Sequence, residues 1–212
     1  MVFDFDGTLA DTRLAVSRVV NLTLREAGLP RVDPGCIHAW MGLPLVELFR
    51  RAIPPTAQPY DASPLVAAYR ARFPEDGESL VTPYAECAEV LAALRARGVR
   101  TAIATSREGT STRRLLDHVG LGGFEFIASC ESVDRGKPAP DLLELVLTHT
   151  GVAAERTWMI GDTTFDVLMA KAAGVRVAAV THGCHDRASL EAAGADPVWD
   201  DLWGVLSLVE GV

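Results

Sequence analysis

Two carboxylates stand two residues apart near the start of the chain, in the run Asp4-Phe5-Asp6-Gly7-Thr8-Leu9 that ends a short apolar stretch. Alternate side chains of an extended segment point to the same side, so Asp4 and Asp6 are expected to converge while Phe5 turns into the core. Two close carboxylates repel each other unless a cation lies between them. The pair therefore predicts a site for a hard cation such as Mg2+, whereas a plain strand followed by an Asp-Gly turn would explain only Asp6 and Gly7.

Two further polar segments could meet this pair. Thr105 and Ser106 follow an apolar run, and a hydroxyl there can donate a hydrogen bond to a phosphoryl oxygen, although both residue types are also common helix caps. Lys137 lies in Gly136-Lys137-Pro138-Ala139-Pro140-Asp141, where the prolines fix the backbone ahead of a helix. A lysine held there would neutralise both the aspartates and a bound phosphate. The alternative is a solvated surface lysine.

A last polar segment, Gly161-Asp162-Thr163-Thr164-Phe165-Asp166, directly follows the apolar Trp158-Met159-Ile160. Asp162 falls at the tip of the predicted strand and Asp166 one helical turn later, so both can face the cleft that holds Asp4. Each could instead serve only as a helix cap or as an acid in the first turn. For Asp162 and Asp166 we favour the metal interpretation, because they belong to an ordered set of polar segments that also includes Asp4, Asp6 and Lys137.

The elements around these residues predict an α/β fold. From Ala85 onward, amphipathic stretches alternate with apolar runs, and the junctions at Gly98, Gly151 and Gly174 indicate helices that end at a glycine. Apolar strands that alternate with helices imply a Rossmann-like, doubly wound parallel sheet, whose ligands bind beyond the carboxyl ends of the strands. The predicted strands are 1–5, 101–105, 124–128, 157–160 and 175–180.

The pattern changes between Asp11 and about Pro83, where no convincing strand occurs. Helices are predicted near 12–27, 44–52 and 64–73. The loops Ile53-Pro54-Pro55 and Gln58-Pro59 favour a compact lid over a flexible linker. We therefore predict an inserted α-helical cap domain at 11–83, and a catalytic core made of 1–10 and 84–212.

The composition of the 212 residues is that of an ordinary globular protein with a net charge of -8, which argues against nucleic acid or an anionic membrane as the main partner. No signal peptide and no apolar run of about 18 residues is visible. The four cysteines lack close-paired spacing, so we expect them to be reduced and the protein to be cytoplasmic. They are Cys36, Cys87, Cys130 and Cys184.

Taken together, these segments resemble the motifs of the haloacid dehalogenase superfamily, and the similarity spans the chain. The position of the helical insertion is similar to that of the phosphoglycolate phosphatase-like group. The resemblance implies that Asp4 is the nucleophile and forms an aspartyl-phosphate, and that Asp6 protonates the leaving oxygen and then activates water. It also implies a Mg2+ site made by Asp4, the backbone carbonyl of Asp6 and Asp162, with Asp166 supporting it.

The resemblance further implies that Thr105 and Lys137 are catalytic and bind the phosphoryl group together with Ser106. Relatives that dehalogenate or pump ions lack an acid at the position of Asp6, so hydrolysis is favoured here. Two departures stand out. Only three residues precede Asp4, so the first strand is expected to be short or its start misassigned, and the second motif reads Thr-Ser where many relatives have Thr-Asn.

Substrate selection is expected to come from the cap. The segment Trp40-Met41-Gly42-Leu43-Pro44 resembles the cap loop that contacts substrate in relatives, with Gly42 as a substrate-binding residue, although it is equally explained as an apolar helix junction. Arg50 and Arg51 could meet a substrate carboxylate, but exposed helix arginines are commoner. His182-Gly183-Cys184-His185 lacks a fourth ligand for zinc and is better explained as a loop that borders the pocket.

The leading hypothesis is a Mg2+-dependent phosphatase of a small phosphorylated metabolite, with 2-phosphoglycolate as the best single candidate, acting as a monomer or homodimer. A sugar phosphomutase could use the same motifs, and a binding protein without turnover could keep the fold.

Overall fold

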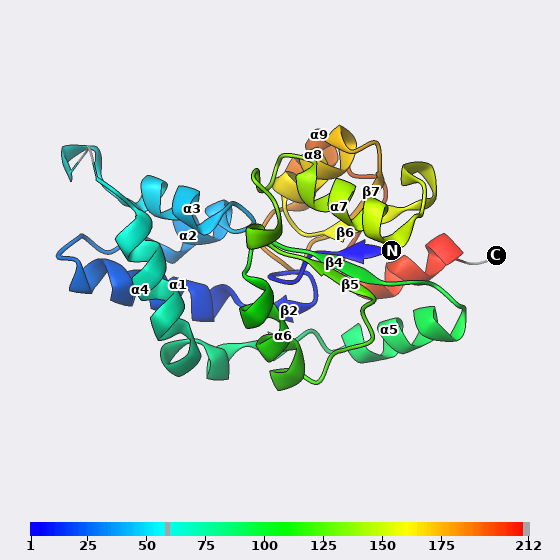
Figure 1. The fold of residues 1–212 in the computed structure, drawn as a ribbon, viewed down its shortest axis with the longest axis horizontal. Coiled ribbons are helices and arrows are strands. Elements are labelled where there is room, and N and C mark those ends of the chain that lie inside the picture. Colours follow the sequence, from blue (N-terminus) through cyan, green and yellow to red (C-terminus); the bar gives the residue numbers. More distant parts are fainter. Residues whose placement is uncertain (58–59, 210–212) are drawn as a thin grey trace.

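The computed structural model describes residues 1–57 and 60–209. A helical part lies beside an α/β part built on one parallel sheet (Figure 1). This is the α/β, Rossmann-like fold with a helical insertion that the sequence predicts. The predicted loop Gln58-Pro59 and the last three residues of the predicted core lie outside the described residues. Within the described part of the chain, no helix is both long enough and apolar enough to span a membrane.

The sheet has the strand order β5-β4-β1-β6-β7-β8, and every pairing is parallel. The chain builds outward from β1 on both sides, so the strand order reverses there and a crevice opens at the carboxyl ends of the strands. All five predicted strands are present, and β8 was missed. The strands are β1 (Val2–Phe3), β4 (Ala102–Ala104), β5 (Phe126–Ala128), β6 (Trp158–Gly161), β7 (Arg176–Val180) and β8 (Val198–Trp199).

Helices cover both faces of the sheet, as a doubly wound fold requires (Figure 1). Alternate residues of β1 point to opposite sides: Phe3 packs with Leu94 and Leu115, and Val2 packs with Leu142 and Val167. The helices α5 (Cys87–Ala96) and α6 (Gly109–His118) lie on the first face, together with a final 3-10 helix (Leu202–Val209). The second face carries α7 (Asp141–Thr150), α8 (Thr164–Ala172) and α9 (Arg187–Ala193). The predicted junction glycines 98, 151 and 174 all have positive φ, between 67° and 70°.

The helical part, called the cap below, consists of α1 (Arg13–Glu26), α2 (Pro34–Trp40), α3 (Leu45–Ala52) and α4 (Ser63–Asp76). The helix α2 was not predicted from the sequence. It has only seven residues, and its start depends on the Asp33 side chain, which accepts a hydrogen bond from the Gly35 N–H. Tyr69 holds the cap core together, because its ring lies 6.0 Å from Phe49 and 5.5 Å from Phe73, centre to centre. Further short 3-10 turns are Pro55–Ala57, Glu78–Leu80, Cys130–Ser132 and Ala154–Arg156.

Two short strands join the cap to the rest of the chain. Residues of β2 (Ala10–Asp11) pair antiparallel with those of β3 (Thr82–Pro83), Ala10 with Pro83 and Asp11 with Thr82. The expectation that no strand occurs between Asp11 and Pro83 is wrong at these two ends. Two-residue strands show no periodicity, because their pairing is made by the tertiary fold. The predicted domain boundary at residues 10/11 falls within this ribbon and the one at 83/84 falls at its end, and both stay a prediction.

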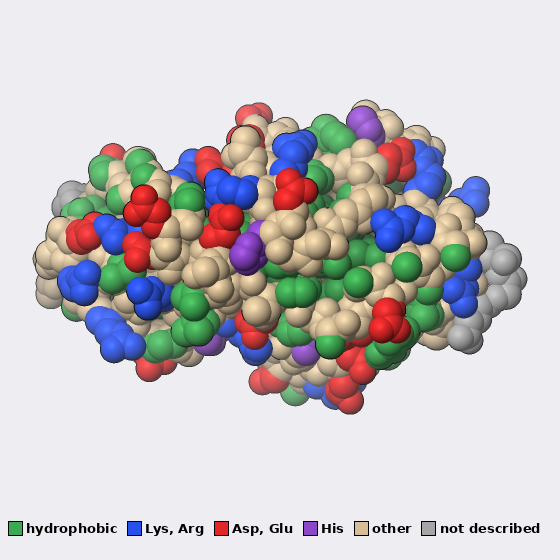
Figure 2. Space-filling model, turned by 90° about the horizontal axis from the view of Figure 1, so that it is seen from below, with side chains coloured by type: hydrophobic (Ala, Val, Ile, Leu, Met, Phe, Trp, Pro, Cys, Tyr) green, Lys and Arg blue, Asp and Glu red, His purple; other side chains and the backbone are tan. Residues whose placement is uncertain are grey.

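The face seen in Figure 2 carries acidic and basic side chains side by side, over both the cap and the sheet part. The negative net charge is therefore not gathered into a single acidic field on this face.

Candidate active site

The predicted polar residues come together at the carboxyl ends of three neighbouring strands. Asp4 follows β1, Thr105 follows β4 and Asp162 follows β6. The Asp4 N–H continues the pairing of β1 by donating to the Ile160 carbonyl at 2.9 Å. Parallel strands therefore place these side chains at one edge of the sheet, where ligands of such folds bind.

Three buried carboxylates form a cluster around one lysine. One oxygen atom from each of Asp4, Asp162 and Asp166 lies within 4.8 Å of the other two. The Lys137 Nζ lies 2.8 Å from Asp4 Oδ1 and 2.7 Å from Asp166 Oδ1, and the lysine side chain is 0% exposed. The alternative of a solvated surface lysine is thus wrong. Within the described residues, these three aspartates are the only cluster of side chains placed to hold a metal ion.

The cluster carries more negative than positive charge. Burial raises the pKa of Asp4 well above its usual range, although the Lys137 ammonium opposes this shift. Burial, with the neighbouring Asp166 carboxylate, raises the pKa of Asp162 to about 7. A divalent cation would favour the charged form of both groups. A donor set of carboxylate oxygens in a negatively charged, buried place fits Mg2+, with Asp4, Asp162 and Asp166 as the residues that could hold it.

Asp166 both caps its helix and belongs to the cluster. Its Oδ2 accepts hydrogen bonds from the N–H and the hydroxyl of Thr163, at 3.1 and 2.7 Å, in a capping box at the start of α8. Its Oδ1 is then free to meet Lys137. Asp166 therefore caps α8 and also lies beside Asp4 and Asp162, while its role in a metal site stays a prediction.

Asp162 is held by one side-chain donor and one backbone donor. Its Oδ1 accepts from the Thr8 hydroxyl at 2.9 Å, and its Oδ2 accepts from the Cys184 N–H at 2.8 Å. Gly7 has a φ of +86°, and a Cβ there would lie 2.2 Å from Asp162 Oδ2. Glycine is therefore required at position 7, because any side chain there would collide with the Asp162 carboxylate.

The Asp6 carboxylate lines the same cleft as Asp4 but has a different partner. It is not part of the three-aspartate cluster and forms a two-pronged ion pair with Arg107, with Nε to Oδ2 at 3.0 Å and Nη2 to Oδ1 at 2.6 Å. Burial alone would raise the pKa of Asp6, but the Arg107 guanidinium outweighs it and lowers the pKa. Arg107 was not predicted from the sequence as a site residue, although it directly follows Thr105 and Ser106 after an apolar strand, which was the available signal.

The hydroxyls of the second motif are already engaged. Thr105 is buried and its Oγ1 accepts from the Arg107 N–H at 3.1 Å, while the Ser106 hydroxyl donates to the Gly42 carbonyl of the cap at 2.6 Å. Gly42 has a φ of +93° and lies against Thr163, so the α2–α3 loop comes close to the core. The segment around Gly42 is therefore both a helix junction and a wall of the cleft.

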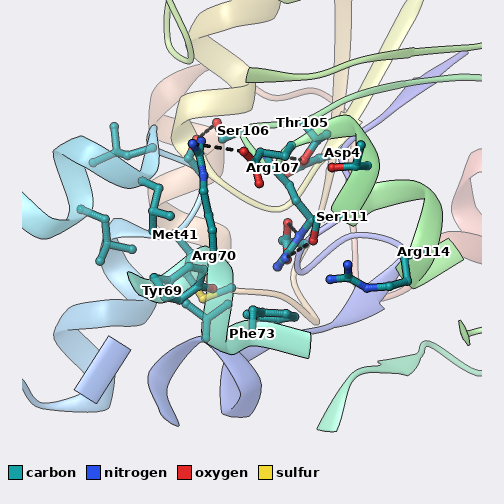
Figure 3. Close-up of a pocket in the computed structure, with 18 residues that line it drawn as sticks. Asp4, Met41, Tyr69, Arg70, Phe73, Thr105, Ser106, Arg107, Ser111 and Arg114 are labelled. Carbon is teal, nitrogen blue, oxygen red and sulfur yellow. Dashed lines mark hydrogen bonds and ion pairs between the residues drawn. The ribbon is translucent and has the colours of Figure 1, made fainter. Parts of the chain in front are cut away.

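An open cleft lies between the cap and the strand ends. Figure 3 shows Tyr69 and Phe73 on the cap side and Asp4, Thr105 and Arg107 on the strand side. Apolar cap residues thus face a polar floor that contains both aspartates of the first motif. The side chains that line the cleft on the cap side are Val16, Met41, Leu43, Leu45, Leu48, Tyr69, Arg70 and Phe73.

The other candidates from the sequence, two arginines and two histidines, have partners outside the aspartate cluster. Arg50 and Arg51 are exposed and pair with Glu47 on their own helix, away from the cleft. His182 stacks on the Tyr84 ring with centroids 3.8 Å apart, and the Nδ1 of His185 accepts from the Thr164 N–H at 3.0 Å. The two imidazoles have different partners and do not form a zinc cluster with Cys184 within the described residues.

The parallel sheet, the helical insertion and the polar residues at the strand ends define a haloacid dehalogenase-like hydrolase. The family model of that description matches residues 1–180, and the chain belongs to this family. It is 34% identical over 205 residues to the Dickeya dadantii (strain 3937) protein named "Probable phosphatase IndB", which covers 94% of this chain and 88% of that one. It is 30% identical to a phosphoglycolate phosphatase of Pseudomonas putida (97% of this chain, 78% of that one).

A solved structure shows the same fold. The haloacid dehalogenase-like family hydrolase from Streptococcus pneumoniae superposes with a TM-score of 0.86 at 25% identity, covering 99% of this chain and 97% of that one.

Proposed function

We propose that this hydrolase is a Mg2+-dependent phosphatase that cleaves the phosphate monoester of a small metabolite through an aspartyl-phosphate at Asp4. The observation that carries the proposal is the buried Asp4 carboxylate, which faces the cleft beside Lys137 and two further carboxylates. The phosphatase names of two relatives support the same activity.

The roles proposed for the side chains are those that the family resemblance implies, and the position of Asp4 beside Lys137 supports them. An oxygen of Asp4 attacks phosphorus, and the bond from phosphorus to the substrate oxygen breaks. Asp6 supplies the proton that this oxygen takes up, for which Asp6 must first take up a proton from solvent and release one of its oxygens from Arg107. Asp6 then takes a proton from water as the water attacks phosphorus, and Asp4 is released. Lys137 holds Asp4 in place and offsets the repulsion between its carboxylate and the phosphate. A bound Mg2+ would supply further positive charge between Asp4 and Asp162.

The substrate proposed first is 2-phosphoglycolate, because the Pseudomonas putida relative carries that activity in its name. Thr105, Ser106, Lys137 and Gly42 are proposed to contact it, since three of them line the cleft and Lys137 touches Asp4. A cytoplasmic monomer or homodimer remains part of the proposal.

The test is Mg2+-dependent phosphate release from 2-phosphoglycolate, sugar phosphates, nucleoside monophosphates and pyrophosphate. The full chain is compared with Asp4→Asn and with Asp117→Asn, which removes an exposed carboxylate of α6. We expect turnover of 2-phosphoglycolate above the other esters, loss of about 1,000-fold or more in Asp4→Asn, and little change in Asp117→Asn. Isomer formation from a sugar phosphate without phosphate release would favour the mutase, and turnover that survives in Asp4→Asn would overturn the mechanism.

A further inference from the structure

Arg107 is the most tightly held cation on the floor of the cleft besides Lys137. Its side chain is 8% exposed, and both oxygens of Asp6 accept hydrogen bonds from it. The guanidinium lies over the Phe73 ring of the cap at 4.5 Å, and Nη1 donates to the Ser111 hydroxyl at 3.2 Å (Figure 3). A flat guanidinium held by an aromatic face and a carboxylate is fixed in orientation, as binding of a planar anion requires.

The contacts of Arg107 place it beside the reacting part of the substrate. Under the proposed function, Asp6 reaches the oxygen that leaves phosphorus. Arg107 touches both oxygens of Asp6 within 3.0 Å. The carbon attached to the leaving oxygen, and the groups on that carbon, therefore fall within reach of the same guanidinium.

The charge of Arg107 is balanced by the carboxylate of Asp6, which the proposed mechanism also uses. Among the residues that the structure describes, Asp6 is the one acidic side chain paired with it. When Asp6 turns an oxygen toward the substrate, that oxygen gives up its bond to Arg107. The cap side of the cleft offers Tyr69 and Phe73 rather than a carboxylate. A buried guanidinium without an anion is unfavourable, so an anion from the substrate would complete the site.

We propose that Arg107 is a specificity residue that binds a carboxylate carried by the carbon next to the phosphorylated oxygen. The substrate class is then the 2-phosphooxy carboxylates, and phosphate esters of neutral alcohols are disfavoured. This proposal rests on the proposed phosphatase function and narrows its substrate.

The experiment compares kcat/KM for 2-phosphoglycolate and for 2-hydroxyethyl phosphate, in which a neutral CH2OH replaces the carboxylate. Wild-type protein is expected to prefer the acid by about 100-fold, because a site built for a charged group rejects an analogue that lacks it. Arg107→Gln is expected to bring this ratio close to 1, and Arg107→Lys to give an intermediate ratio, since lysine keeps the charge without the planar fork. Arg113→Gln, an exposed arginine of α6 outside the cleft, should keep the wild-type ratio.

The ratio of the two kcat/KM values distinguishes binding of the substrate carboxylate by Arg107 from a role of Arg107 in positioning Asp6. If Arg107 only positions Asp6, the variant loses activity on both substrates equally and the ratio stays high, which overturns the proposal. A wild-type protein that hydrolyses both esters equally overturns it without any variant. Absence of phosphate release from every ester would instead overturn the proposed function itself.

Discussion

Lys137 sets the charge balance of the site, because one buried ammonium lies within 2.8 Å of two carboxylates. We expect Lys137→Met to lower the free energy of unfolding by about 3 kcal/mol at pH 7, since it leaves Asp4 and Asp166 buried without their cation. The loss should be smaller at pH 5, because a carboxylate whose pKa is raised can then bind a proton. Urea unfolding measures both values.

The matched control is Lys171→Met, which removes the other lysine of the chain. That side chain is exposed at the end of α8 and donates to the Ala193 carbonyl. Lys171→Met should lower the free energy of unfolding by no more than about 1 kcal/mol. Equal losses in the two variants would show that the cluster does not depend on Lys137.

At the scale of single residues, the carboxylate cluster could be predicted because Asp4 and Asp162 each follow an apolar run and Asp166 lies one helical turn after Asp162. Asp4, Asp162 and Asp166 come together as expected, since strand ends of a parallel sheet share one edge. The partner of Asp6 could not be predicted in the same way. The pairing of Asp6 with Arg107 depends on the directions of both side chains and on the ring of Phe73 in the cap, over which the guanidinium lies.

The α2–α3 loop closes one side of the cleft through a glycine. Gly42→Ala is expected to destabilise the protein by about 2 kcal/mol or more, because φ is +93° and the new Cβ would lie 2.8 Å from Thr163 Oγ1. It should also raise KM, since the loop lines the cleft. Gly28→Ala is the control: φ is +69° but no atom lies within 4 Å of the new Cβ, so only the backbone cost of about 1 kcal/mol remains.

Thermal unfolding and steady-state kinetics of both variants separate the two effects. A KM raised equally in both, or in neither, would mean that contact between Gly42 and the core does not shape the cleft.

At the scale of elements, the strands and the long helices were predictable from apolar runs and periodicity, within a few residues at their ends. The ribbon of β2 and β3, the strand β8 and the helix α2 were not. Each has at most seven residues, and each depends on partners that lie elsewhere in the fold, such as Val180 beside Trp199. Short segments of this kind show no hydrophobic period to detect.

For the molecule as a whole, the buried carboxylates predict a pH dependence of the metal-free protein. The pKa of Asp162 is about 7 in the fold and 3.8 in its ordinary state. Between these values the folded protein binds more protons than the unfolded chain, so the free energy of unfolding falls as pH rises, by about 1 kcal/mol per pH unit. Asp162→Asn should remove the part of this slope that Asp162 contributes, while the raised pKa of Asp4 keeps its own part. A chelated wild-type protein that gains stability from pH 4 to 7 relative to Asp162→Asn would contradict the sign.

Bound Mg2+ should offset the fall in the free energy of unfolding that the metal-free protein shows as pH rises. At pH 8 and 100 times its dissociation constant, a cation that binds only the folded state raises the free energy of unfolding by about 2.7 kcal/mol. The shift in melting temperature with added Mg2+ measures this, and it should shrink strongly in Asp162→Asn. An equal shift in the variant would place the cation elsewhere.

The cap is joined to the core only through the neighbouring strands β2 and β3, as far as the described residues show. Because Ala10 faces Pro83 across an antiparallel pair, both connections of the cap leave the core side by side. Two such strands can be joined by a turn of two residues. An ancestor could therefore acquire, lose or exchange the whole insertion at this one place, and its descendants would inherit the strand-end chemistry while they changed the lid above it.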